Sequence, residues 1–129
     1  MYDIKIEGDF SSAHNLRGYK GKCEELHGHN WRVELVVSSG KLDNIGMVMD
    51  FKSLKEKLNN LLEKLDHKYL NNIPYFSAAG GSASGGKKIN PTSENIAKYI
   101  YDNLKKKIPG LYSVTVWESD KACATYYVK

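Results

Sequence analysis

Apolar and polar side chains alternate along two stretches near the start of the chain. In the first stretch the apolar positions are Tyr2, Ile4, Ile6 and Phe10, and in the second they are Trp31, Val33, Leu35 and Val37. A period of two is typical of a strand with one buried face. Continuing the first pattern places Ser12 and His14 on its apolar side. Extending the second pattern backwards places His27 and His29 beside Trp31.

Two amphipathic helices are predicted in the middle of the chain. Asp50 is a suitable N-cap for the first, and an apolar stripe runs behind it from Phe51 to Leu65. The second begins near Pro91, and its apolar positions are Ile96, Ala97, Ile100, Leu104 and Ile108. The Pro-Gly pair at 109–110 stops this helix.

Two more alternating segments close the chain. One has Tyr112, Val114, Val116 and Glu118 on a single face, and the other has Ala122, Ala124, Tyr126 and Val128. The order of elements is therefore strand, strand, helix, helix, strand, strand (ββααββ). Paired strands at each end predict an α+β fold, in which an antiparallel sheet carries both helices on one face.

Length and composition favour a single domain over residues 1–129. The 129 residues suit one domain, and 41% hydrophobic with 26% charged residues is ordinary for a globular protein. Residues 77–88 form a Gly/Ser/Ala-rich loop, which is either a natural surface loop or an engineered insertion. No run nears the roughly 20 apolar residues that span a bilayer, and no secretory signal follows Met1. We therefore expect a cytoplasmic protein with no membrane partner.

The charge and the cysteines restrict the function only weakly. A net charge of +4 permits an anionic substrate or a nucleic acid and requires neither. Since the chain has no RNA-binding motif, we expect no nucleic-acid partner. The two cysteines, Cys23 and Cys123, should be free thiols in a reducing compartment.

Three histidines form a candidate metal site. His27 and His29 are two positions apart on a strand and therefore point the same way. His14 ends the neighbouring strand with compatible parity. Three imidazoles with one open position are typical of a catalytic zinc site. The alternative is that all three are hydrogen-bonded strand residues, which fits a lone histidine better than this set.

For each of the other candidate residues, a structural role is an alternative to a catalytic role. Cys23 lies four positions before His27 and could act as a base or nucleophile, or be a small buried side chain, as we interpret Cys123. Asp66 and His67 could form a proton relay with Cys23, or be a polar helix end.

Two groups of carboxyl and hydroxyl side chains are also candidates for ligand binding. Glu118 needs a partner on its apolar face, such as a ligand with paired N–H groups, unless the strand end already lies in water. Thr92 and Glu94 either contact a ligand or cap the second helix.

Six stretches of the chain together resemble the family of 6-pyruvoyl-tetrahydropterin synthase and 6-carboxy-tetrahydropterin synthase. They are Phe10–His14, Cys23–His29, Gly46–Phe51, Leu65–Asn71, Pro91–Ala97 and Val116–Glu118, in the family's order. The resemblance implies the tunnelling fold (T-fold). It further implies trimers that close a twelve-stranded barrel, and two trimers that stack into a homohexamer with active sites at subunit interfaces.

The resemblance also implies roles for the candidate residues. Zn²⁺ would be bound by His14, His27 and His29. The proton-transfer set would be Cys23, Asp66 and His67. Glu118 would anchor the pterin, and Thr92 and Glu94 would line the pocket. As a separate hypothesis, the basic residues Arg17, Lys20 and Lys22 would hold the triphosphate.

The activity implied is that of a lyase in pterin metabolism. It is the zinc-dependent conversion of 7,8-dihydroneopterin triphosphate to 6-carboxy-5,6,7,8-tetrahydropterin, on the route to queuosine. One alternative is a 6-pyruvoyl-tetrahydropterin synthase. Another is a non-catalytic oligomeric pterin-binding protein, against which Cys23 with Asp66 and His67 argues.

Glu24 indicates a further alternative, because it stands next to Cys23. Family members with a glutamate as catalytic group cleave the side chain to 6-hydroxymethyl-dihydropterin, a folate precursor. A carboxylate can take a hydroxyl proton and start this retro-aldol cleavage, whereas a thiolate suits a carbon-bound proton. The structural alternative for Glu24 is a solvated loop charge.

Overall fold

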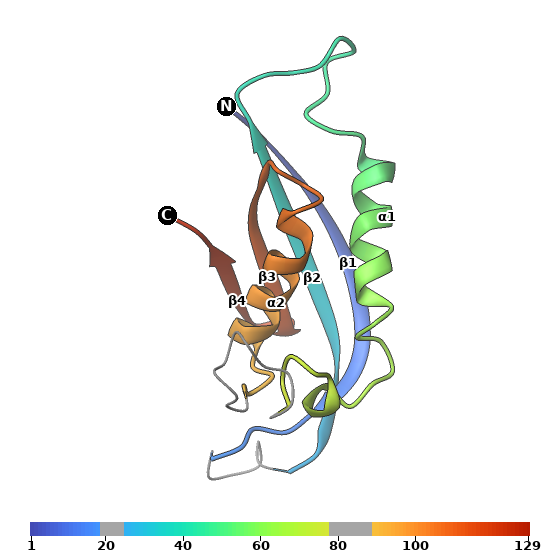
Figure 1. Ribbon diagram of the computed structural model, residues 1–129, viewed down its shortest axis with the longest axis vertical. Coiled ribbons are helices and arrows are strands. Elements are labelled where there is room, and N and C mark those ends of the chain that lie inside the picture. The colour runs from blue at the N-terminus through green and yellow to red at the C-terminus, as the bar shows by residue number, and fades with distance from the viewer. Residues whose placement is uncertain (19–24, 78–88) are drawn as a thin grey trace.

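A four-stranded antiparallel sheet is the frame of the protein (Figure 1). The computed structural model describes residues 1–18, 25–77 and 89–129. The strands are β1 (Tyr2–His14), β2 (His27–Ser39), β3 (Leu111–Ser119) and β4 (Ala122–Tyr127), in the spatial order β1-β2-β3-β4. Between β2 and β3 the chain forms α1 (Phe51–Leu62), the short 3-10 helix η2 (Leu70–Asn72) and α2 (Ser93–Lys105). The predicted α+β class and the order ββααββ are confirmed.

The core lies between the sheet and the two helices, which cover one face (Figure 1). From the sheet it receives the alternating apolar residues Ile6, Phe10, Trp31, Val33, Leu35, Val114 and Val116. From the helices it receives Leu54, Leu58, Leu61, Leu62, Ile96, Ile100 and Leu104. The period-two and period-3.6 patterns therefore meet in one layer. Phe51, which was predicted to start the apolar stripe, is half exposed.

Both helices begin at the predicted caps. The carboxylate of Asp50 accepts a hydrogen bond from the backbone N–H of Lys52 at 3.2 Å. The hydroxyl of Thr92 accepts one from the N–H of Asn95 at 3.1 Å. Such bonds satisfy N–H groups that have no partner within the helix.

The face of β3 differs from the prediction at one residue. Tyr112 was expected beside Val114, but its side chain is 52% exposed, while Leu111 is buried. The register between β2 and β3 shifts between Val36 and Val37, which adds a residue on β3 and reverses the side-chain direction below it. A bulge of this kind cannot be read from alternation alone.

The chain after α1 returns to the outer edge of β1. The backbone N–H of His67 donates to the carbonyl of Ser11 at 2.6 Å, and the N–H of Ala13 donates to the carbonyl of Lys68 at 3.1 Å. A single parallel bridge joins Ala13 to Tyr69. This segment therefore covers the carboxyl-terminal part of the β1 edge and lies close to the end of the strand that carries His14.

Several predictions fall on residues that the structure does not describe. They concern Cys23, Glu24, Lys20, Lys22 and nearly all of the Gly/Ser/Ala-rich loop, since residues 19–24 and 78–88 lie outside the described ranges. Within those ranges, no helix has the length and apolar character that a bilayer crossing requires.

Candidate metal centre

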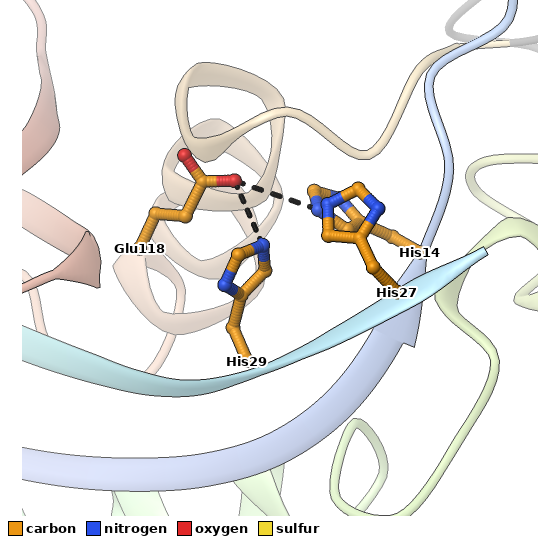
Figure 2. Close-up of side chains that lie close together, drawn as sticks. All are labelled: His14, His27, His29 and Glu118. Atoms are coloured by element: carbon orange, nitrogen blue, oxygen red, sulfur yellow. Dashed lines mark ion pairs between the residues drawn. The ribbon is translucent and has the colours of Figure 1, made fainter. Parts of the chain in front are cut away.

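The ends of three strands bring three histidines and a glutamate together (Figure 2). His14 ends β1 and pairs in register with His27 at the start of β2, while His29 lies opposite Ser12. All three imidazoles therefore project from the same face of adjoining strands. Glu118 reaches them from β3, and one potential ligand atom of each residue lies within 4.8 Å of the others.

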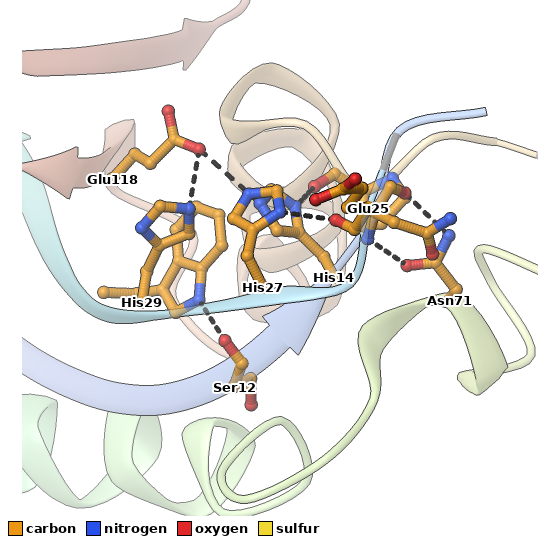
Figure 3. A network of polar contacts seen from close by, with 10 residues as sticks. Ser12, His14, Glu25, His27, His29, Asn71 and Glu118 are labelled. Carbon is orange, nitrogen blue, oxygen red and sulfur yellow. Dashed lines mark hydrogen bonds and ion pairs between the residues drawn. The ribbon is translucent and has the colours of Figure 1, made fainter. Parts of the chain in front are cut away.

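Two backbone carbonyls determine which ring nitrogen carries the hydrogen in two imidazoles (Figure 3). Nδ1 of His14 lies 2.8 Å from the carbonyl oxygen of Pro91, and Nδ1 of His27 lies 2.7 Å from that of Glu25. Because a carbonyl only accepts, each Nδ1 carries the hydrogen and donates it. In the neutral rings Nε2 is then left with a free lone pair, which is the form that binds a metal.

Burial also favours the neutral form of two rings of the cluster, those of His14 and His29. Desolvation lowers the pKa of His14 below its ordinary value, and the neighbouring imidazoles of His27 and His29 lower it further. Desolvation likewise lowers the pKa of His29, against the opposing effect of Glu118. A neutral imidazole is a metal ligand, whereas a protonated one is not.

The cluster brings buried ring nitrogens close to a carboxylate oxygen. Among the described residues, Nε2 of His14 and Nε2 of His29 are buried without a hydrogen-bond partner. The Glu118 Oε1 atom lies 3.5 Å and 3.0 Å from them, close enough for ion pairs but not aligned as hydrogen bonds. In neutral His14 the Nε2 lone pair and the carboxylate oxygen repel at this distance, unless a cation lies between them; Nε2 of His29 lies beside the same oxygen. The residues present therefore fit a metal ion.

The surroundings hold the histidines in place. The Trp31 ring contacts the rings of His14 and His29 edge-on, with centroids 4.9 and 5.1 Å apart. Its indole N–H donates to the Ser12 carbonyl at 3.2 Å, and the Ser12 hydroxyl donates to the carbonyl of Leu65. Through these contacts, Trp31 and Ser12 connect the histidines to the segment after α1.

Asp66 and His67 form a second, separate pair. Oδ2 of Asp66 lies 2.9 Å from Nδ1 of His67, and the backbone N–H of Ser11 donates to Oδ1 at 2.8 Å. That N–H, more than any other group, holds the pKa of Asp66 below its usual range. His67 adopts a left-handed backbone with φ 54°, and its side chain is 83% exposed. The pair lies on the outer edge of β1 rather than in the metal cluster.

The remaining candidates have structural partners. Thr92 caps α2, and Glu94 lies in its first turn. Two guanidinium nitrogens of Arg17 donate to the carbonyls of Ile89 and Asn71, both at 3.2 Å. Arg17 therefore joins two segments of the chain, and its proposed role at a triphosphate stays a prediction.

Cys123 was predicted to be a small buried residue, and this is wrong. It lies in β4, the edge strand, where the thiol is exposed. On an edge strand without helix cover, position within the strand does not imply burial.

Sequence reasoning missed the residues that orient the histidines. Pro91 orients His14 through its carbonyl, and Asn71 holds the next residue by exchanging hydrogen bonds with the backbone of Asn15 at 3.0 and 2.8 Å. The Pro91 contact is invisible in the sequence because any residue supplies a carbonyl. The sequence shows only that the polar Asn71 follows the apolar Leu70. The structure shows that both side chains are buried.

The fold and the cluster define an α+β protein in which three histidines and a glutamate at the ends of antiparallel strands could hold a metal ion. A family model described as 6-pyruvoyl tetrahydropterin synthase matches residues 3–129. The chain belongs to this family, and the predicted family and tunnelling fold are confirmed.

Known relatives support the same conclusion. The chain is 40% identical to a 6-carboxy-5,6,7,8-tetrahydropterin synthase of Synechocystis, over 98% of this chain and 94% of the relative. It is 35% identical to a dihydroneopterin monophosphate aldolase of Pyrococcus furiosus, over 92% and 90%. The structure of 6-pyruvoyl tetrahydropterin synthase from Caenorhabditis elegans matches with a TM-score of 0.80 and 28% identity, over 99% and 96%.

Proposed function

We propose that this protein is a zinc-dependent lyase that converts 7,8-dihydroneopterin triphosphate to 6-carboxy-5,6,7,8-tetrahydropterin. The observation that carries the proposal is the cluster of His14, His27, His29 and Glu118, in which one potential ligand atom of each residue lies within 4.8 Å of the others. Burial lowers the pKa of His14 and of His29, which favours the neutral, metal-binding form of both rings. The 40% identity with a 6-carboxy-5,6,7,8-tetrahydropterin synthase supports this activity.

Each part of the site has a task in this reaction. Zn²⁺ bound by the three histidines would supply Lewis acidity toward the oxygens of the substrate side chain. The Glu118 carboxylate accepts the paired N–H groups of the pterin, and Thr92 and Glu94 line the pocket. Cys23 takes a proton from substrate carbon, and His67, oriented by Asp66, handles the second transfer.

The position of Asp66 and His67 supports a site shared between chains. The imidazole of His67 is 83% exposed, and it is not among the side chains that converge on the metal cluster. In addition, β1 and β4 are both edge strands, and unpaired edges favour pairing with another chain. A homohexamer of two barrel trimers, in which His67 of one chain completes the active site of another, accounts for both features.

The proposed function is tested by turnover. The purified protein with zinc is incubated with 7,8-dihydroneopterin triphosphate, and the products are identified by mass spectrometry. We expect 6-carboxy-5,6,7,8-tetrahydropterin as the main product. A 6-pyruvoyl product would instead indicate the alternative synthase. Binding of the substrate without formation of any product would indicate a non-catalytic pterin-binding protein and would contradict the proposed lyase activity.

The aldolase relative favours a second candidate activity, side-chain cleavage to 6-hydroxymethyl-dihydropterin. Glu24 is its proposed base. In the same assay we expect this product as a minor species from the wild type. It should disappear in Glu24→Gln while the product that depends on Cys23 persists. Unchanged product ratios in Glu24→Gln would remove the second activity from this residue.

The shared site predicts the assembly in solution. Multi-angle light scattering should give a mass of six chains, because barrel closure pairs the free edges of β1 and β4. A monomer at assay concentrations would contradict both the hexamer and the shared active site.

A further inference from the structure

Glu118 is in an unusual position on β3. The register between β3 and β4 shifts between Trp117 and Ser119, so Glu118 is the extra residue of a bulge and has no partner on β4. Bulges next to active sites redirect a side chain. Here the bulge directs one carboxylate oxygen of Glu118 toward the histidines, while the other points away (Figure 2).

The distances at that oxygen match those between two ligands of one ion. A tetrahedral zinc ion holds nitrogen and oxygen ligands at about 2.0 Å, which places two ligands roughly 3.3 Å apart. Oε1 of Glu118 lies 3.0 Å from Nε2 of His29 and 3.5 Å from Nε2 of His14. These distances, and the lack of a hydrogen bond at either contact, fit a carboxylate in the place of a fourth ligand.

This position conflicts with the role of Glu118 in the proposed function. A carboxylate whose oxygen is bound to the ion cannot at the same time present both oxygens to the paired N–H groups of a pterin. Three histidines and a carboxylate would also fill a tetrahedral ion and leave no open position, which a catalytic zinc site needs.

We propose that Glu118 is a displaceable fourth ligand of the metal. It closes the metal site while the pocket is empty, and it leaves the ion for the pterin N–H groups when substrate enters. The open coordination position thus exists only in the presence of a pterin. The exchange of Glu118 between metal and pterin rests on the proposed function. The ligation of the metal by Glu118 does not.

The surroundings of Glu118 allow this exchange. In the part of the chain that the structure describes, its carboxylate accepts no hydrogen bond, and 37% of its side chain is exposed. The residue before it is fixed, because the Trp117 indole donates to Glu34 at 2.9 Å and lies 4.5 Å from the Arg32 guanidinium. The backbone is therefore held at Trp117, and only the side chain beyond it needs to move.

The ligation is tested with Co²⁺, whose visible absorption reports the number and type of its ligands. Glu118→Gln and Glu118→Ala are compared with the wild type and with Asp120→Asn, which removes an exposed carboxylate from the adjoining turn. Outer partners of metal ligands are worth about 10–100-fold in affinity, so the loss of a direct ligand should weaken Co²⁺ binding by at least about tenfold. We expect this loss and a changed spectrum in Glu118→Ala, and neither in Asp120→Asn. Wild-type affinity and spectrum in both Glu118 variants would overturn the proposal.

The exchange is tested on the wild type, which avoids any folding defect of a variant. Unsubstituted pterin, which has no side-chain hydroxyl groups, is added to the Co²⁺ protein. The spectrum should shift toward that of Glu118→Ala, and by linkage pterin should bind more tightly to the metal-free protein than to the Co²⁺ form. Pterin binding with an unchanged spectrum would overturn the exchange and leave the proposed function standing. A failure of pterin to bind either form would contradict the proposed function itself.

Discussion

Replacing Cys23 with alanine is expected to remove nearly all turnover while the metal stays bound. The substitution deletes the group proposed to take a proton from substrate carbon and leaves the three histidines intact. Positioned general bases contribute about 10²–10⁴-fold to a rate. The product formed from 7,8-dihydroneopterin triphosphate should therefore fall by about that factor, with unchanged zinc content by metal analysis.

Cys123→Ala is the matched control for this experiment, because it makes the same substitution at the other cysteine of the chain. The Cys123 thiol is exposed on β4, and it contributes nothing to the proposed chemistry. Turnover by this variant should match the wild type. Wild-type turnover by Cys23→Ala would make Cys23 a structural residue and overturn its assignment as the base.

Replacing His29 with alanine is expected to reduce the metal content from one zinc per chain to nearly none. Within the described residues, Nε2 of His29 is buried without a hydrogen-bond partner, which fits the proposed metal ligation. Two histidines and a carboxylate remain in the variant, which is one ligand fewer than the set that converges here. Metal analysis of the purified proteins measures the change, and circular dichroism checks that the variant is folded.

His67→Ala serves as the control, since it removes an imidazole that lies outside the cluster and is largely exposed. This variant should keep its zinc and lose turnover, which separates metal binding from proton transfer. Equal zinc in His29→Ala and the wild type would exclude His29 as a ligand. Zinc loss in His67→Ala would instead show that the metal site extends beyond the residues assigned to it.

Local patterns were sufficient for most of the fold. Alternation and helical periodicity depend only on the geometry of neighbouring residues, so they predicted the order of the elements and placed His14, His27 and His29 on one face. The caps Asp50 and Thr92 were predictable for the same reason, because a cap acts within its own first turn. Alternation failed at Tyr112, where the register with another strand changes the direction of the side chain.

The sequence by itself determined that His14, His27 and His29 lie on one face of the sheet, because strand parity and the spacing of His27 and His29 place them there. Only the tertiary structure decided how they are used. The carbonyl that orients His14 belongs to Pro91, 77 positions later, and such a contact depends on the backbone rather than on residue type. The bulge that directs Glu118 to the histidines depends on the register of β3 with β4. Long-range pairing leaves no local pattern, and this pairing brings three aligned histidines together with Glu118 as a group that could hold a metal ion.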